Sequence, residues 1–545
     1  MTPDTSPDHR GTLRTAIALV ALSLAVRCAL LAVYLLHDVP TVFDEGVYVR
    51  TGEAFAGIYR AWLHGESPAP ELWTAAYGRG VWPPLHASTL GVAFLLFGQS
   101  AAVGRALGVL ISAATTLGIF GLGRRLGFGR GATAGALLHA LFPGFVAFSS
   151  FLWSEALFVA LVVGTALATL RFANASTGGS AYATAGAAGA LAGLATLTRS
   201  AGLPLALAVP GALLLLGGMR RRSWIAATLA LALALSILAP WLVWLGLREH
   251  RPVLLSTRTS YYLLFDNSAP SEPGHARPGE VRQRFEDRGS GTTRNVVLAQ
   301  VVSQLQQSPL RSLGRLVNRA RALFGPDVYI LRHLLAAIWP PVGPRAAAVV
   351  VLIAFLAPVL GVALAARGAL AIVLPRRRAA AMVLLLLAVA AAPTLTISNS
   401  RMGLPTIALL LPFAGVGATA RLPERRRQLR RMVWLGATIL ATWNVVTVQR
   451  ANGDSLLASA WYGELAFDLG RALGIPSQTA DCVALAFTGS ALDRDLEIRP
   501  ESPELRIAGA PEGFRWSPQK GQRKTHLLVE SATDPAPVEL VVVGL

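Results

Sequence analysis

Apolar runs of about 18–25 residues recur along most of this 545-residue chain, and each is long enough to cross a bilayer as an α-helix. Hydrophobic residues make up 53% of the chain and charged residues only 14%, with a mean hydropathy of +0.51. Soluble domains carry roughly 25% charged residues. The runs are too numerous for a soluble domain with one anchor, so the sequence predicts an all-α polytopic membrane protein.

Basic residues give the chain a net charge of +19. The arginines gather in short tracts between apolar runs, which is the distribution expected for loops on the cytoplasmic side of a membrane. This accounts for the charge without a nucleic-acid partner, and we expect none. The strongest tracts are Arg124, Arg125 and Arg130, then Arg220–Arg222, Arg376–Arg378 and Arg425–Arg431.

These tracts share one side of the membrane only if an even number of spans separates each from the next. The sequence satisfies this condition with about eleven spans, the N-terminus inside and the C-terminus outside. The run from Pro84 to Gly98 is only about 15 residues, so we expect a juxtamembrane or re-entrant helix there. The expected spans lie near 14–36, 101–123, 131–149, 152–171, 181–198, 201–218, 223–247, 346–366, 379–397, 402–420 and 432–449.

This topology divides the chain into a membrane domain, 1–450, and a tail, 451–545. Two large loops of the membrane domain lie outside, 37–100 and 248–345, and the second contains an amphipathic stretch near 295–325 whose arginines suit a bilayer surface. The tail is soluble-like in composition and has short β-like runs, which predict a small extracytoplasmic α/β or β domain.

Two adjacent carboxylates, Asp44 and Glu45, follow the first span directly. One interpretation is structural, because Asp44 stands where a helix begins and both charges suit a helix N-terminus. The other is functional, because a carboxylate at the membrane surface can act as a general base toward a hydroxyl group or help to bind a metal ion. Adjacent carboxylates also raise each other's pKa.

Further polar residues fall on the same predicted side. His86 follows the Pro83-Pro84 pair and is either a polar cover on a short helix or a contact for phosphate or sugar. Glu155 opens a span, either as an interfacial residue or as a partner of Asp44. Arg199 and Arg401 interrupt apolar runs outside, against the usual charge bias, which indicates either headgroup anchoring or an anionic ligand such as phosphate.

The large loop 248–345 contains an aromatic patch with Tyr261 and Tyr262, followed by Asn267. It suits either a membrane-interface belt or a surface that contacts a ligand. Phosphate-binding loops, dinucleotide fingerprints, zinc-protease motifs and serine-hydrolase motifs are missing from the sequence. A donor delivered on a lipid therefore fits better than a soluble nucleotide sugar.

Together these segments resemble the GT-C glycosyltransferases, in the branch with the bacterial aminoarabinose transferase, protein O-mannosyltransferases and rhizobial lipopolysaccharide-core transferases. The resemblance covers about 14–420. It rests on the order of the motifs: Asp44-Glu45 with Tyr48, Pro83-Pro84-Leu85, Gly104-Arg105-Ala106-Leu107, Gly123 to Gly127, Phe142 to Glu155, Leu194 to Arg199, Asn267, and Ser400-Arg401 with Pro405.

The resemblance implies an inverting glycosyltransferase of a bacterial inner membrane that takes its sugar from a polyprenyl phosphate. Asp44 would be the base, Glu45 and Glu155 would support it, and Arg199 or Arg401 would hold the phosphate. The acceptor would be a glycan, a lipid or a protein. Relatives often carry Lys before the Pro pair, where this chain has Trp82.

This interpretation does not require a cofactor. Relatives with diphosphate donors use a divalent cation, however, and a cation bound by Asp44 and Glu45 remains an open alternative. A transporter or flippase for lipid-linked sugars is the competing interpretation. Transporters place ionisable residues near the middle of the membrane and often show internal repeats. Here the spans are nearly free of Asp and Glu, which favours chemistry at the surface.

Overall fold

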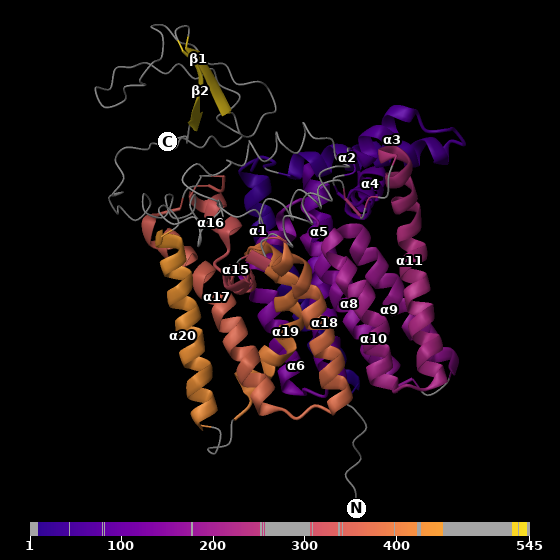
Figure 1. Ribbon diagram of the computed structural model, residues 1–545, viewed down its shortest axis with the longest axis vertical. Helices are drawn as coiled ribbons and strands as arrows, with labels where there is room; N and C mark the ends of the chain where they lie inside the picture. The colour runs from indigo at the N-terminus through magenta and orange to yellow at the C-terminus, as the bar shows by residue number, and fades with distance from the viewer. Residues whose placement is uncertain are drawn as a thin grey trace, which may run out of the picture.

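A computed structural model describes residues 9–256 and 303–450 with short gaps (43, 79, 81, 176–177, 251–252, 254, 304–305, 308, 336–337, 341, 397 and 422–426), together with 526–531 and 534–541. Long helices stand side by side as a bundle, and shorter helices cover one of its ends (Figure 1). The predicted all-α polytopic fold is confirmed.

Eight described helices are long and apolar enough to cross a membrane, and the bent pair α6–α7 makes a ninth. Two further predicted spans, α9 (Gly178–Thr198) and α20 (Arg427–Arg450), are also helices of the bundle. The eight are α1 (His9–Leu36), α5 (Ala101–Arg125), α8 (Glu155–Phe172), α10 (Leu203–Gly217, extended by a 3-10 turn at Ser200–Gly202), α11 (Arg221–Glu249), α17 (Pro344–Ala371), α18 (Arg376–Leu395) and α19 (Ser400–Thr419).

The predicted span at 131–149 is two helices, α6 (Arg130–Leu141) and α7 (Pro143–Ser150), which meet at 50°. Pro143 causes the break because it has no N–H for the carbonyl of His139, four residues earlier. Arg27 of α1 donates to that carbonyl (3.3 Å) and to the carbonyl of Ala140 (3.0 Å). Its Nε donates to Ser112 (2.8 Å). The buried guanidinium therefore replaces backbone partners that lipid cannot supply.

Small residues bring the helices of the bundle into close contact. A Cβ added at Gly189 of α9 would lie 2.0 Å from the carbonyl oxygen of Ala230 on α11. Gly415 of α19 meets the backbone of Gly131 and Gly135 on α6 in the same way. Glycine is needed at these positions because any side chain would force the backbones apart.

The first loop, 37–100, forms a cover over the upper end of the bundle in Figure 1. It consists of α2 (Glu45–Leu63), α3 (Pro70–Tyr77) and α4 (Leu85–Phe97). At 13 residues α4 is too short to span, as predicted for this run. Tyr77 fixes the cover to α11 by packing its ring against Trp244, with 4.7 Å between centroids.

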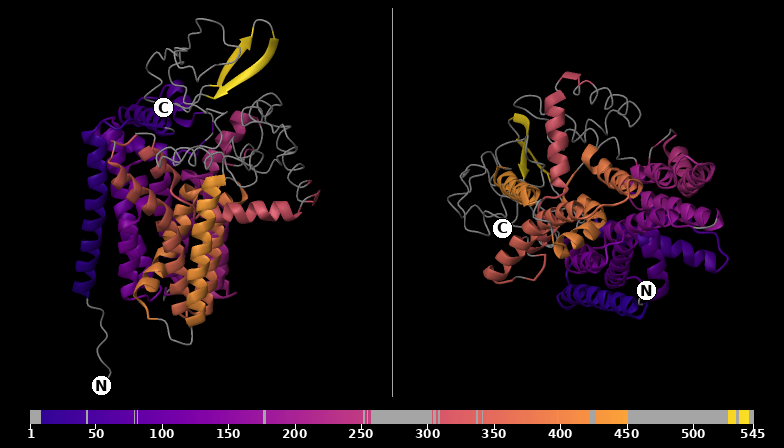
Figure 2. Two further views of the ribbon diagram at one scale, coloured as in Figure 1. Left: turned by 90° about the vertical axis from the view of Figure 1, so that its left-hand side faces the viewer. Right: turned by 90° about the horizontal axis from the view of Figure 1, so that it is seen from below.

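The second large loop returns to the bundle through α15 (Pro309–Ala322) and α16 (Val328–Leu335). The first of these is the predicted amphipathic helix. It leaves the bundle sideways (Figure 2) and exposes Leu310, Leu313 and Val317. Within the predicted tail, the described residues form one antiparallel pair, β1 (His526–Ser531) with β2 (Asp534–Val541).

We predict that Gly189→Ala lowers the thermal stability of the detergent-purified protein, because the new methyl group collides with the backbone of α11. A stability loss of about 1–3 kcal/mol is typical of such overpacking. The matched control is Gly179→Ala on the same helix, where an added Cβ meets nothing within 4 Å. Equal melting temperatures of the two variants would show that α9 and α11 are not packed this closely.

Candidate active site

Four charged residues from four parts of the chain meet at the upper end of the bundle. Asp44 precedes α2, Glu155 begins α8, Arg199 follows α9, and Arg401 lies in the first turn of α19. Each stands at the end of a helix, so the alternating direction of the spans brings them to one level. The sequence predicted that these four residues share a side, and the structure brings them into contact.

Glu155 is the centre of this cluster. Its Oε1 accepts hydrogen bonds from Arg199 Nη1 and Arg401 Nε, and its side chain is only 3% exposed. A buried charge is tolerated when it is both paired and hydrogen-bonded. One carboxylate oxygen thereby fixes two guanidinium groups, and each guanidinium keeps further N–H donors for other acceptors.

Asp44 is the accessible carboxylate of the group. It stands at the N-cap position of α2, where its charge suits the helix N-terminus, but its side chain makes no capping hydrogen bond. Its Oδ2 lies 3.7 Å from Arg401 Nη1, and the side chain is 40% exposed. It is therefore held beside a cation and open to an incoming molecule.

Glu45, the next residue, points elsewhere. Its two oxygens accept the backbone N–H groups of Val42 (2.8 Å) and Leu152 (2.9 Å), and Arg105 Nη2 lies 4.0 Å away. The side chain is 1% exposed. Glu45 thus ties the start of the first loop to the turn before α8, and it holds Asp44 in place rather than facing a substrate.

His86 fixes the same turn from α4. Its Nε2 lies 3.2 Å from the carbonyl oxygen of Leu152, so this nitrogen carries the proton and donates it. Burial lowers the pKa of His86 to about 4, which makes the ring neutral near pH 7. The predicted contact of His86 with phosphate or sugar thus falls on a neutral side chain that is buried and bonded to the backbone.

Tyr48 connects the first loop to the cluster. Its hydroxyl donates to Ser154 Oγ (3.3 Å), which also accepts from Arg199 Nη1 (3.1 Å). Its ring meets His86 edge-on, with 4.8 Å between centroids. Burial raises the pKa of Tyr48 to about 12, so the phenol stays protonated and acts as a donor.

Two aromatic residues that the sequence did not single out hold Arg401. Its Cζ lies 4.2 Å from the centroid of the Trp153 ring and 5.5 Å from that of Tyr329. Such contacts stabilise a cation that has lost water. Trp153 had a usable signal, since it stands two residues before Glu155. Tyr329 lies in α16, a short helix that the sequence analysis did not predict, and nothing in the sequence pointed to it.

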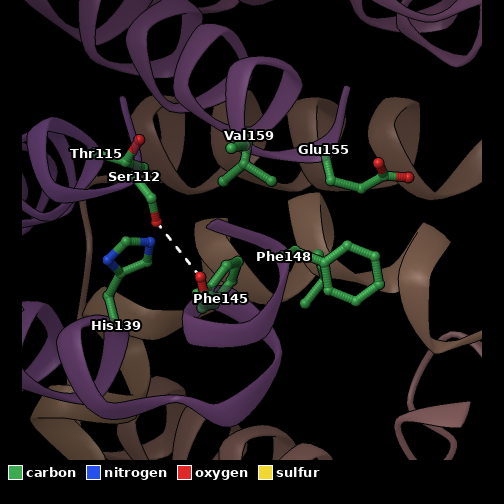
Figure 3. Close-up of a pocket in the computed structure, with 9 residues that line it drawn as sticks. Ser112, Thr115, His139, Phe145, Phe148, Glu155 and Val159 are labelled. Carbon is green, nitrogen blue, oxygen red and sulfur yellow. Dashed lines mark hydrogen bonds between the residues drawn. The ribbon is translucent and has the colours of Figure 1, made fainter. Parts of the chain in front are cut away.

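A small cavity separates this cluster from the Arg27 network deeper in the bundle (Figure 3). Glu155 and His139 lie at opposite ends of the lining residues, Val159 lies between them, and Phe148 lies on the side of Glu155. The other oxygen of Glu155, Oε2, has no hydrogen-bond partner among the described residues. This oxygen is nevertheless buried, so the protein shields it from solvent.

A divalent cation at Asp44 and Glu45 was the open alternative for this site. The two carboxylates do not converge, since Asp44 faces Arg401 and Glu45 binds backbone N–H groups. Within the described part of the chain, no three His, Cys, Asp or Glu residues are grouped as metal ligands would be. The predicted contacts at Tyr261, Tyr262 and Asn267 lie outside the described residues.

The fold and the cluster define a multi-pass membrane protein whose polar site lies at the ends of its helices. Residues 81–244 match the family model for dolichyl-phosphate-mannose-protein mannosyltransferases, and this window contains His86, Glu155 and Arg199. The match confirms the predicted resemblance to the GT-C glycosyltransferases.

Solved structures of similar arrangement include ArnT from Cupriavidus metallidurans bound to undecaprenyl phosphate, at 17% identity over 84% of this chain and 75% of that chain, with a TM-score of 0.43. AglB from Archaeoglobus fulgidus, an archaeal oligosaccharyltransferase, is 16% identical over 81% of this chain and 58% of that chain, with a TM-score of 0.43. No curated protein sequence matches the chain.

We predict that Glu45→Gln lowers the thermal stability of the purified protein. Both oxygens of Glu45 accept backbone N–H groups. In glutamine an NH₂ group replaces one of these oxygens and would face an N–H donor, at a cost of about 1–3 kcal/mol. Glu66→Gln, at an exposed position in the same loop, is the control and should melt like the wild type. A Glu45→Gln protein of unchanged stability would contradict the anchoring role.

Proposed function

We propose that this chain is an integral-membrane glycosyltransferase that moves a sugar from a polyprenyl-phosphate donor to an extracytoplasmic acceptor, which is a glycolipid, a polysaccharide or a protein. One observation carries the proposal: the half-exposed Asp44 lies 3.7 Å from Arg401, in a cluster that holds the buried Arg401 and the partly buried Arg199. A base beside fixed cations is what transfer from a phosphate-linked donor requires. The matched family is itself described by a lipid-phosphate sugar donor.

Asp44 is the general base in this mechanism. It accepts the proton of an acceptor hydroxyl as that oxygen attacks the anomeric carbon of the sugar. The bond from the acceptor oxygen to the anomeric carbon forms while the bond from that carbon to the phosphate oxygen breaks. The polyprenyl phosphate leaves from the opposite face, so a single displacement inverts the configuration at this carbon.

Arg199 and Arg401 bind the phosphate that leaves. Their guanidinium groups are permanently charged, and each has N–H donors beyond those given to Glu155. Pre-oriented donors stabilise the charge that develops on a leaving group, because they need no reorganisation as the reaction proceeds. Glu155 supports the reaction by fixing both arginines, and Glu45 does so by fixing the segment that carries Asp44.

A flippase for lipid-linked sugars, without transferase activity, is the alternative. The distribution of acids disfavours it. Among the described spans, Asp and Glu occur only at the ends, with Glu155 at the start of α8 and Glu249 at the end of α11. The buried Arg27 is accounted for by the carbonyls at the α6–α7 break.

In the proposed orientation, the site and the N-terminus lie on opposite sides of a bacterial inner membrane, with the site outside.

We predict that Asp44→Asn abolishes transfer, with a loss of about 10²–10⁴-fold, because the amide cannot accept the proton. A strain that lacks its own copy would be complemented with the variant, and its envelope glycans would be weighed by mass spectrometry. Asp38→Asn, an exposed acid in the same loop, is the matched control. The missing mass would identify the sugar.

Complementation by Asp44→Asn at normal protein level would remove Asp44 as the base. Loss of the glycan in the deletion strain, together with lipid-linked sugar translocation by the purified wild type and no transfer, would favour the flippase instead.

We also predict that transfer by the purified protein survives EDTA, because Asp44 and Glu45 face different partners and do not form a ligand pair. The measurement compares the initial rate before and after chelation, with a lipid extract from the source membrane as donor. A rate that falls with EDTA and returns with Mg²⁺ or Mn²⁺ would place a cation in the site.

A further inference from the structure

A buried acid lies beside the site without being part of it. Asp327 stands between α15 and α16 and is only 5% exposed. Burial raises the pKa of its carboxyl group to about 7, which marks the ionised form as costly to keep at this place. The mechanism proposed above does not use this residue, and no pattern in the sequence singled it out.

The backbone of Asp327 joins α16 to α17 at the turn that precedes Pro358. Pro358, inside α17, has no N–H to give to the carbonyl of Ala354, four residues earlier. The N–H of Asp327 donates to that carbonyl instead (3.1 Å), and the Asp327 carbonyl accepts from Leu331 as the first bond of α16. The start of α16 is therefore attached to a fixed point in the bundle.

The side chain completes the attachment. Asp327 Oδ1 accepts the N–H of Ile330 at 3.4 Å, which is an N-cap bond. Its Oδ2 faces α7, where a Cβ added at Gly144 would lie 2.9 Å from this oxygen. The absence of a side chain at Gly144 gives the carboxyl group its space.

Tyr329 follows two residues later and contacts the site. Its ring meets Trp153 edge-on, with 4.7 Å between centroids, and lies 5.5 Å from Arg401 Cζ. Arg401 is thus bordered by Tyr329 and Trp153, while its Nε donates to Glu155 and its Nη1 faces Asp44. The position of this ring depends on where α16 begins.

We infer that Asp327 is a positioning residue which, through Tyr329, holds Arg401 in the orientation that binds the phosphate of a lipid-linked donor. The identity of that ligand rests on the proposed function, whereas the link from Asp327 to Tyr329 does not. Asp327 itself touches neither the ligand nor the reacting atoms.

The test is a double-mutant cycle on purified protein in nanodiscs, with undecaprenyl phosphate as the titrated ligand. Asp327→Ala removes the cap and is expected to weaken binding about fivefold, the effect of losing one cation–aromatic contact. Asp327→Asn keeps an acceptor for the Ile330 N–H and is the matched control, expected to bind like the wild type. In a Tyr329→Leu background, Asp327→Ala should have no further effect.

Hydrogen exchange of residues 328–335 gives a readout that does not depend on the ligand. Asp327→Ala should speed exchange in this segment, because an uncapped helix opens more often. Unchanged exchange, or additive effects in the cycle, would overturn the inference.

If the wild type does not bind undecaprenyl phosphate, the proposed function fails while the exchange result still decides the structural link. If Asp327→Ala does not fold, Gly144→Ala perturbs the same oxygen and takes its place in both measurements.

Discussion

The turn between α7 and α8 is the constraint on which the rest of the site depends. The backbone of Leu152 is held on both sides, by Glu45 at its N–H and by His86 at its carbonyl. The next three residues then serve the cluster in succession, since Trp153 lies against Arg401, Ser154 accepts from Tyr48 and Arg199, and Glu155 pairs with both arginines. Fixing one residue of a tight turn fixes its neighbours, because the backbone has only two soft torsions per residue.

Two prolines leave helix carbonyls without their usual N–H donors. In lipid, a carbonyl that loses its helical partner must find another donor within the protein. The carbonyl freed by Pro143 accepts from a guanidinium of α1, and the carbonyl freed by Pro358, inside the continuous α17, accepts from the backbone N–H of Asp327. Both solutions connect segments that are far apart in the sequence. The irregular parts of the helices thereby set how the bundle is joined, while the glycine contacts set how closely it is packed.

Much of the architecture could be predicted because hydropathy and charge act along the chain. Arginine tracts and span parity placed Asp44, Glu155, Arg199 and Arg401 on one side, and the structure brings them together. The different roles of Asp44 and Glu45 could not be predicted. These adjacent acids differ only in their spatial partners, which are Arg401 for Asp44 and backbone N–H groups for Glu45. Arg27 and Tyr329 were missed for a related reason. Their partners belong to other helices, and a single sequence does not show which helices meet.

The partners of Arg27 also impose an order on biosynthesis. A lone arginine at the centre of a membrane helix costs about 2.5–3.5 kcal/mol on insertion. Ser23 on the same helix accepts one hydrogen bond, and the other acceptors are Ser112 on α5 and the carbonyls of His139 and Ala140 at the end of α6. The ribosome must therefore add more than a hundred residues after Arg27 before these other acceptors all exist. Until then, Arg27 has Ser23 of its own helix as a partner, but not the full set of acceptors that α5 and α6 provide.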